Sequence, residues 1–305
     1  MKSEIKNTLI CDPDTGVCEV PAVPPNSQKV EATKAVLKPV RVIYYTDPIC
    51  SSCWGIEPQL RKLKLEYGHL LNFEYRMGGL LPDWNYNSGG IGKPEDVAQH
   101  WDEVSYYLQM PIDGDVWLED PLYSSYPPST AFKAAQLQDD QKAIVFLRRL
   151  RELLFLEKKN ITKWEHVKQA ALYSQLDVNQ LKKDYQNGIA ERDFLEDLEL
   201  GRQLGIRGFP TIIFIDEDGN EQLIYGSKPY TDYEMAIKKL LPTSKKNFYD
   251  DSLNNLMAHY PSLTVKEYAE LSNINILVAK QTLESLSSKK QLKKTVTKNG
   301  NLYSL

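Results

Sequence analysis

The chain has 305 residues, room for about two structural units of ordinary domain size. Its 42% hydrophobic and 26% charged content is typical of a globular protein that buries a core. With 37 basic and 41 acidic residues, the net charge of -4 gives no overall attraction to nucleic acid or anionic membranes. No apolar run approaches the roughly 20 residues of a membrane-spanning helix, so we expect no membrane partner.

The N-terminal segment, residues 1–38, is predicted to be an irregular arm. Its lysines are not followed by the apolar stretch of a secretory signal, so we expect a cytoplasmic protein. Cys11 and Cys18 enclose turn-forming residues, and the chain could fold back and bring the two sulfur atoms together. The pair is either two exposed thiols on a disordered tail or an accessory dithiol that exchanges with a second pair.

That second pair follows a short apolar strand at residues 42–45 and an Asp-Pro turn. An amphipathic helix is predicted at 59–67, with Cys50 and Cys53 in its first turn. The positive end of a helix dipole favours a thiolate, so Cys50 is the candidate nucleophile. Because two residues separate the cysteines, Cys53 can reach Cys50 and close a disulfide, chemistry that requires no cofactor.

Two other roles are open to these cysteines. A structural zinc site normally needs four ligands, and the spacing of Cys11 and Cys18 is not typical of such a site. The pair could also be two inert buried thiols. The position between a strand and a helix favours redox chemistry over both, since structural disulfides are rare in a reducing cytosol. We therefore predict no metal.

Residues 71–77 alternate as a second strand, which a right-handed crossover would place parallel to the first. The pattern then becomes helical. Pro94 is predicted to open one helix, 140–157 to form another, and Thr162 to Glu165 to be a capping box before a further one. The apolar stripes of these helices are expected to be core and not a cofactor pocket.

The strand-rich frame resumes at Phe209-Pro210-Thr211, followed by an apolar strand, a hairpin turn and a closing helix at 231–241. A proline is tolerated at the start of a strand. Its peptide bond is either trans, the commoner form, or cis. The predicted boundaries are 39–93 and 206–242 for the frame, and 94–205 for the helical insertion.

Residues 248–305 are predicted to form a separate module of three short helices and a hairpin, the outline of a winged helix. The module has seven lysines and no arginine against five acidic residues, and its third helix has only Lys280, with Glu284 nearby. Because this is a weak electrostatic footprint for DNA, we expect contact with protein or dimerisation instead.

Over residues 40–241, a CxxC at a helix start, a helical insertion and a Phe-Pro-Thr before a strand resemble DsbA-like thioredoxin-fold proteins, particularly the cytoplasmic FrnE-type branch. The resemblance implies an α/β thioredoxin fold with a large helical insertion, joined to the winged-helix-like module. It implies Cys50 as nucleophile, Cys53 as resolving thiol and Pro210 as a cis-proline beside the dithiol. The implied substrate-binding residues are Phe209, Pro210 and Thr211, with Phe209 offering backbone hydrogen bonds to an extended substrate.

Three segments resemble more narrowly the YjbH (SpxH) family of adaptors, which deliver the transcription factor Spx to the ClpXP protease: 116–119, 131–136 and 155–162. The dipeptide Ser51-Ser52 lacks the proline common in the FrnE branch and the histidine that helps to acidify DsbA. The direction of electron flow therefore stays open. The N-terminal arm with its two cysteines is also not part of the adaptor pattern.

Three functions are compatible with these features. The first, which the sequence favours, is a cytoplasmic thiol-disulfide oxidoreductase acting on a disulfide of a protein or a small thiol. The second is an adaptor that binds an Spx-like client protein for ClpXP proteolysis, with the dithiol as a redox sensor. The third and weakest is a redox-sensing DNA binder.

Overall fold

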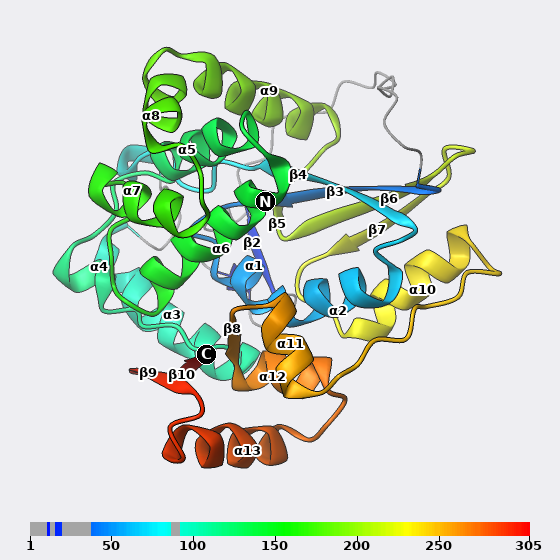
Figure 1. The fold of residues 1–305 in the computed structure, drawn as a ribbon. Coiled ribbons are helices and arrows are strands. Elements are labelled where there is room, and N and C mark those ends of the chain that lie inside the picture. Colours follow the sequence, from blue (N-terminus) through cyan, green and yellow to red (C-terminus); the bar gives the residue numbers. More distant parts are fainter. Residues whose placement is uncertain (1–10, 13–15, 20–37, 87–91) are drawn as a thin grey trace, which may run out of the picture.

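The computed structural model describes residues 11–12, 16–19, 38–86 and 92–305 (Figure 1). A four-stranded sheet lies at its centre, in the order β4-β3-β6-β7. Its strands are β3 (Val40–Thr46), β4 (Leu71–Met77), β6 (Thr211–Asp216) and β7 (Glu221–Tyr225). β4 pairs parallel to β3 as predicted, whereas β6 and β7 pair antiparallel.

Strand β3 is buried on both faces, which is why its sequence is a continuous apolar run and not an alternating one. Helices α2 (Glu57–Tyr67) and α10 (Tyr230–Leu240) pack together on one side of the sheet (Figure 1). Helix α9 (Ile189–Gln203) lies on the other side, where the Tyr45 hydroxyl donates to the Asp197 carbonyl. This mixed sheet between helices is the arrangement that the resemblance implies.

The long segment between β4 and the short strand β5 (Gly208–Phe209) is helical, as predicted. It begins with the short 3-10 helix η1 (Trp84–Tyr86). Its remaining helices are α3 (Pro94–Leu108), α4 (Val116–Glu119), α5 (Tyr126–Gln136), α6 (Asp140–Phe155), α7 (Trp164–Tyr173), α8 (Val178–Gln186) and α9. Within the described ranges, no helix is both long and apolar enough to cross a membrane.

One predicted helix start is wrong. Helix α7 begins at Trp164 with Lys163 as its N-cap, and no side chain caps it. The Thr162 hydroxyl donates instead to Asn160 Oδ1, 2.6 Å away, and the Thr162 N–H donates to the same oxygen. The expected capping box with Glu165 does not form, because the helix starts one residue later than predicted, which leaves Thr162 before the N-cap and Glu165 at the second helical position.

The C-terminal module has a winged-helix-like topology and a hydrophobic core of its own. Its elements are α11 (Leu253–His259), β8 (Ser262–Thr264), α12 (Val265–Leu271), α13 (Ile276–Ser288), β9 (Lys293–Thr297) and β10 (Gly300–Ser304). The sheet order is β8-β10-β9. The prediction of three helices and a hairpin missed β8, which pairs with β10 and closes the small sheet.

Buried ion pairs join this module to the rest of the molecule. Arg61 of α2 lies 3.1 Å from Glu267 of α12 and donates to the Ser262 carbonyl at 2.8 Å. Arg148 of α6 lies 2.7 Å from the same carboxylate. Burial alone would raise the pKa of Glu267, but Arg148 and Arg61 outweigh it and hold that pKa below its usual value. The module is therefore fixed against both α2 and α6.

In the N-terminal arm, the structure describes two short strands and Gly16 between them, and residues 1–10, 13–15 and 20–37 lie outside the described ranges. β1 (Cys11–Asp12) and β2 (Val17–Glu19) form an antiparallel pair, and β2 continues into an antiparallel pair with β5. The three strands make a small sheet in the order β1-β2-β5. The arm thus contributes a hairpin to the main body of the protein.

Candidate functional site

The two cysteines of the predicted redox pair form a disulfide at the start of a short helix. Cys50 is the N-cap residue of α1 (Ser51–Gly55), and its Cα lies 5.2 Å from that of Cys53. The Cys53 N–H donates to the Cys50 Sγ, with 3.1 Å between nitrogen and sulfur. This donor and the adjoining helix end favour a thiolate on Cys50 once the disulfide is reduced.

The helix that holds the cysteines differs from the prediction. The amphipathic helix expected at 59–67 is α2, and the cysteines lie before it on α1, a separate helix. Pro58 explains the break. It has no N–H to continue the hydrogen-bond ladder, and its ring excludes the carbonyl four residues earlier. The redox pair therefore lies on a short segment that its neighbours must hold in place.

Those neighbours come from the helical insertion. The Trp54 indole N–H donates to the Pro111 carbonyl at 3.0 Å, and its ring stacks on Phe155 of α6 with 5.6 Å between centroids. A Cβ added to Gly55 would lie 2.2 Å from the end of the Leu108 side chain, so α3 packs directly against α1. Both cysteines have 0% exposed area. A disulfide or thiol from outside can react with them only after local opening.

Asp47, three residues before Cys50, is fully buried and accepts three hydrogen bonds. Its two oxygens accept from the Ile49 N–H at 3.0 Å, the Leu80 N–H at 2.8 Å and the Ser125 hydroxyl at 2.9 Å. Burial raises the pKa of Asp47 to about 6, although these hydrogen bonds lower it. The carboxyl joins the cysteine loop to the insertion. Sequence reasoning treated it only as part of a turn.

Arg151 of α6 is a second group that the sequence did not single out. Its guanidinium is fully buried, donates to the Thr46 hydroxyl at 2.5 Å and to the Asp47 carbonyl at 3.2 Å, and pairs with Glu57 at 2.7 Å. It therefore binds the end of β3 and the start of α2, on either side of the dithiol. In the sequence, Arg151 is only one charged residue among the apolar residues of the helix predicted at 140–157.

Pro210 lies at the edge of the sheet where β3 ends and the chain continues to the dithiol. Tyr45 pairs with Thr211, so Pro210 is placed just beyond the end of β3, where the chain continues to Cys50. The peptide bond between Phe209 and Pro210 is cis. The Thr211 hydroxyl donates to the Gly208 carbonyl at 2.6 Å. Phe209, one of the predicted substrate-binding residues, lies on β5, and this strand pairs with β2 of the N-terminal arm.

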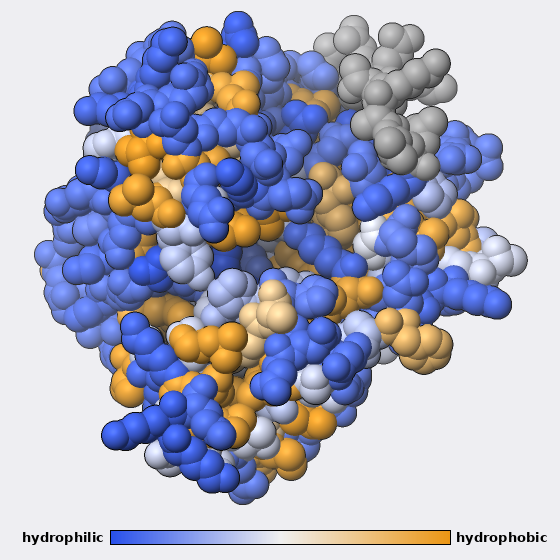
Figure 2. Space-filling view, in the orientation of Figure 1, coloured by the Kyte–Doolittle hydropathy of each residue, from blue (hydrophilic) through white to orange (hydrophobic). Residues whose placement is uncertain are grey.

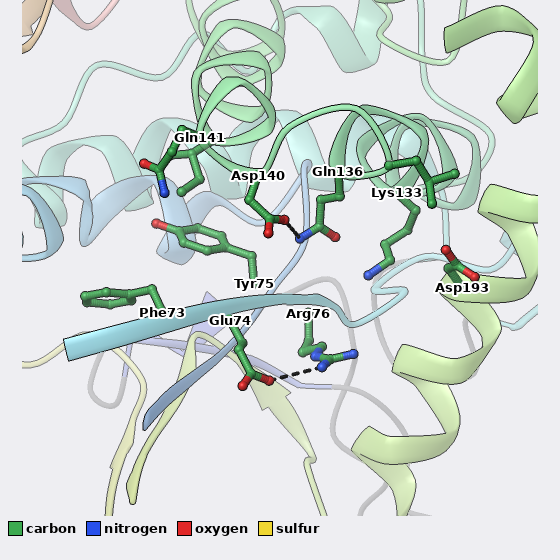
Figure 3. A pocket seen from close by; sticks show the side chains of 11 residues that line it. Phe73, Glu74, Tyr75, Arg76, Lys133, Gln136, Asp140, Gln141 and Asp193 are labelled. Carbon is green, nitrogen blue, oxygen red and sulfur yellow. Dashed lines mark hydrogen bonds and ion pairs between the residues drawn. The ribbon is translucent and has the colours of Figure 1, made fainter. Parts of the chain in front are cut away.

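A cavity of 280 Å³ lies elsewhere, between the edge strand β4 and helices α5, α6 and α9 (Figure 3). Five of its eleven lining residues are charged: Glu74, Arg76, Lys133, Asp140 and Asp193. Arg76 pairs with Glu74 at 3.0 Å. Arg76 and Lys133 each pair with Asp197 at 2.9 Å. These cations are therefore neutralised within the protein, and no residue of the dithiol segment lines the cavity.

Within the described ranges, no three His, Cys, Asp or Glu residues gather as a metal site would require. On the winged-helix-like module, Glu284 of α13 pairs with Lys294 at 2.7 Å and accepts from the Tyr303 hydroxyl. The charge of Lys294, on strand β9 of the wing, is therefore partly neutralised. The side chains of Leu277 and Val278, in contrast, are exposed on α13.

Comparison with known proteins identifies the sequence family. The family described as thioredoxin matches residues 44–235. The ClpXP adapter protein SpxH of Halalkalibacterium halodurans is 32% identical over 303 residues, which cover 98% of this chain and 97% of the relative. The similarity thus extends beyond the thioredoxin-like part and through the C-terminal module.

Solved structures share the fold of the thioredoxin-like part. The cytosolic disulfide reductase DsbM from Pseudomonas aeruginosa has a TM-score of 0.53 and 22% identity, covering 66% of this chain and 98% of its own. A probable DsbA oxidoreductase from Streptomyces coelicolor has a TM-score of 0.53 and 14% identity, covering 70% and 94%. The chain belongs to the thioredoxin family and, over nearly its whole length, to the family of the ClpXP adapter protein SpxH.

Proposed function

We propose that the protein is a cytoplasmic adaptor that binds an Spx-like client and presents it to the ClpXP protease, with Cys50 and Cys53 as a redox sensor. One observation carries the proposal. The likeness to the adapter protein covers 98% of the chain, C-terminal module included, whereas the likeness to disulfide reductase DsbM covers 66%. The part of the molecule outside the thioredoxin fold is therefore shared with the adapter protein.

The burial of the dithiol supports a redox sensor over an enzyme that turns over disulfides. An enzyme that turns over disulfides presents its nucleophile to each new substrate, whereas both cysteines here have no exposed area. A sensor needs only a slow response, because its oxidation state has to change once per signal. Local opening on this slower timescale is compatible with packing by α3 and α6.

The surface of the C-terminal module supports a protein partner. Leu277 and Val278 on α13 and Val296 on the wing are 67%, 49% and 72% exposed, at the positions that a DNA-binding winged helix presents to its target. Figure 2 shows hydrophobic residues gathered on the lower part of the molecule, where this module lies. Apolar side chains of this kind favour a protein surface over phosphates.

A reconstituted degradation assay tests the adaptor role. ClpX, ClpP and an Spx-like client are mixed with and without the full chain, and the loss of client is followed with time. We expect the wild-type chain to accelerate degradation at least fivefold, and Leu277→Glu to remove most of this acceleration. Leu195→Glu, which alters an exposed leucine of α9 at the other end of the molecule, is the matched control. No acceleration and no client binding by the wild-type chain would overturn the proposal.

The second candidate is a thiol-disulfide oxidoreductase, favoured by the hydrogen bond to the Cys50 sulfur and by Pro210 at the same edge. In this reaction the Cys50 thiolate attacks a substrate disulfide and Cys53 resolves the mixed disulfide. The discriminating measurement is turnover of a protein disulfide in glutathione buffer, with Cys50→Ser as the blank. Turnover that Cys50→Ser abolishes supports the enzyme. Equal rates for the two proteins would exclude it.

A further inference from the structure

The edge of β5 next to Pro210 is occupied by the chain itself. An extended substrate is expected to pair with the backbone of Phe209, as a strand added to an open edge. In this protein β2 already pairs there, in antiparallel register, with Cys18 opposite Phe209 and Glu19 opposite Gly208. A segment of the chain's own N-terminal arm therefore takes the position of a substrate strand.

The same strand lies against the helix of the dithiol. β2 contacts α1, which begins directly after Cys50, and it pairs with β5, which leads directly into Pro210 (Figure 1). Cys18 thus belongs to the strand that is adjacent to both parts of the candidate site. The pairing with β5 and the contact with α1 thus place this strand near the dithiol, although Cys18 lies more than 30 positions before Cys50 in the sequence.

The hairpin also places its two cysteines directly opposite each other. Cys11 pairs with Cys18 in the antiparallel ladder between β1 and β2. Opposed residues in such a ladder have their Cα atoms about 4.5 or 5.5 Å apart. Both separations lie within the roughly 4.4 to 6.8 Å that a disulfide requires. The hairpin backbone is therefore compatible with a Cys11–Cys18 disulfide.

The turn of the hairpin is attached to the loop that follows β7. The Gly16 carbonyl accepts from the Ser227 N–H at 3.0 Å, and Gly16 has a φ of 64°, a conformation that favours glycine. A Cβ added at Gly16 would lie 2.4 Å from the Ser227 Cβ. The neighbouring Gly226 N–H donates to the Pro210 carbonyl at 2.9 Å. Contacts at the turn and at β5 thus both hold the hairpin beside Pro210.

We propose that Cys11 and Cys18 form an internal dithiol that exchanges with Cys50 and Cys53, deepening the redox-sensor part of the proposed function. The Cys18 thiolate attacks Cys50 Sγ, the Cys50–Cys53 bond breaks, and Cys53 leaves as a thiolate. The Cys11 thiolate then attacks Cys18 Sγ and releases Cys50. Two electrons pass from the hairpin to the CxxC pair, and the two thiol protons follow through solvent, so no outside oxidant is needed.

The arrangement explains how a buried pair can respond to the redox state of its surroundings. In this proposal the hairpin pair exchanges with an external thiol or disulfide and passes the change to Cys50 and Cys53. Because the two pairs are joined by one chain, the internal step has a rate that is independent of protein concentration. This first-order behaviour separates the proposal from exchange between molecules.

The first experiment uses the full wild-type chain with four cysteines and one disulfide. Fully reduced protein receives one equivalent of diamide, and fully oxidised protein receives one equivalent of dithiothreitol. Both are held without oxygen, quenched in acid, alkylated and mapped by mass spectrometry. We expect the two samples to converge on one ratio of Cys11–Cys18 to Cys50–Cys53, at a rate unchanged over a tenfold range of protein concentration. A rate proportional to concentration, or no interconversion in a day, would overturn the proposal.

The second experiment traps the intermediate. Cys53→Ser removes the resolving sulfur, and we expect diamide to produce an intramolecular Cys18–Cys50 disulfide as the main product. Gly16→Val keeps every cysteine but disturbs the anchored turn, so convergence in the first experiment should slow at least tenfold. Bonds that form only between molecules in Cys53→Ser would count against the exchange. Client degradation by Cys11→Ser/Cys18→Ser, measured separately, distinguishes failure of the exchange from failure of the adaptor role.

Discussion

Asp47 is the residue at which burial and hydrogen bonding compete most directly near the dithiol. Its carboxyl has no exposed area, and three donors surround it. Burial raises its pKa from 3.8 to about 6, which means that the folded protein binds a proton more tightly than the unfolded chain does. By linkage, the protonated carboxyl stabilises the fold below pH 3.8, and this contribution is lost as the pH rises through 6.

Replacing Asp47 by Asn removes this titration. We expect the stability of the wild type relative to Asp47→Asn to fall by about 2 kcal/mol between pH 4 and pH 7. Urea unfolding of both proteins at four pH values measures the difference. Asp250→Asn, at an exposed carboxyl whose pKa is lowered by the Ser252 N–H and hydroxyl, is the control and should not show this fall. A difference that is constant with pH would show that Asp47 is ionised throughout.

At the scale of elements, the end of β4 and strand β5 determine where Pro210 lies. Gly78 directly follows β4, and its N–H donates to the Thr46 carbonyl at 2.8 Å. The ring of Phe209 packs over this glycine so closely that an added Cβ would lie 1.8 Å from a ring carbon. Phe209 has only 1% exposed area, so its ring cannot turn away. Because residue 78 has no side chain, the ring of Phe209 can pack against the end of β4 and hold β5 there.

Gly78→Ala is expected to destabilise the protein by about 1 to 3 kcal/mol, the usual range for overpacking a core. Gly92→Ala is the matched control, because no atom lies within 4 Å of its added Cβ. We expect that change to stay within about 0.5 kcal/mol. Denaturant midpoints of the three proteins provide the measurement. Equal midpoints for Gly78→Ala and the wild type would mean that β5 moves freely, contrary to the packing described.

Two similar motifs illustrate what sequence could and could not predict about elements. Thr162 to Glu165 and Thr264 to Glu267 both have the spacing of a capping box, and only the second forms one. The first helix starts one residue too late for Thr162 to be its N-cap, whereas the second starts directly after Thr264, and a buried ion pair with Arg148 holds Glu267 in place. Periodicity was enough to predict the parallel strand pair and the helical insertion. It did not give the residue at which a helix starts, and a capping box depends on that residue.

The same limit applies to the candidate site. The spacing of Cys50 and Cys53 predicted their pairing, and the resemblance implied that Pro210 lies at the same edge. Asp47 and Arg151 were missed because their importance depends on burial by helices up to a hundred residues away. Strand β2 was missed for a different reason. Its three residues have no alternating pattern, and their partners are β1, which has only two residues, and β5, which lies about 190 positions later in the sequence.

At the scale of the whole molecule, the C-terminal module and the thioredoxin-like part share buried charges. Glu267 accepts hydrogen bonds from Arg148 and forms an ion pair with Arg61, and none of these three side chains is more than about a tenth exposed. Charges buried this deeply are stable only as a set, because each would otherwise lose its hydration without compensation. The two units should therefore unfold together, although each has its own hydrophobic core.

Glu267→Gln tests this coupling, since it keeps the size of the side chain and removes its charge. Two buried arginines each lose one carboxylate partner, while Arg148 keeps Glu152 at 2.9 Å and Arg61 keeps Glu57 at 4.0 Å. We expect a loss of about 3 to 5 kcal/mol and a second unfolding transition for the module. Calorimetry and limited proteolysis near residue 245, between the two units, report the two effects. Glu199→Gln, at an exposed pair with Arg202, is the control and should leave the unfolding midpoint unchanged. If Glu267→Gln unfolded in one transition at the wild-type midpoint, the charges would not couple the two units, and apolar contacts would have to do so. In an adaptor this coupling would let the oxidation state of Cys50 influence a client bound on the C-terminal module, because Trp54 of α1 and Glu267 of the module both contact α6.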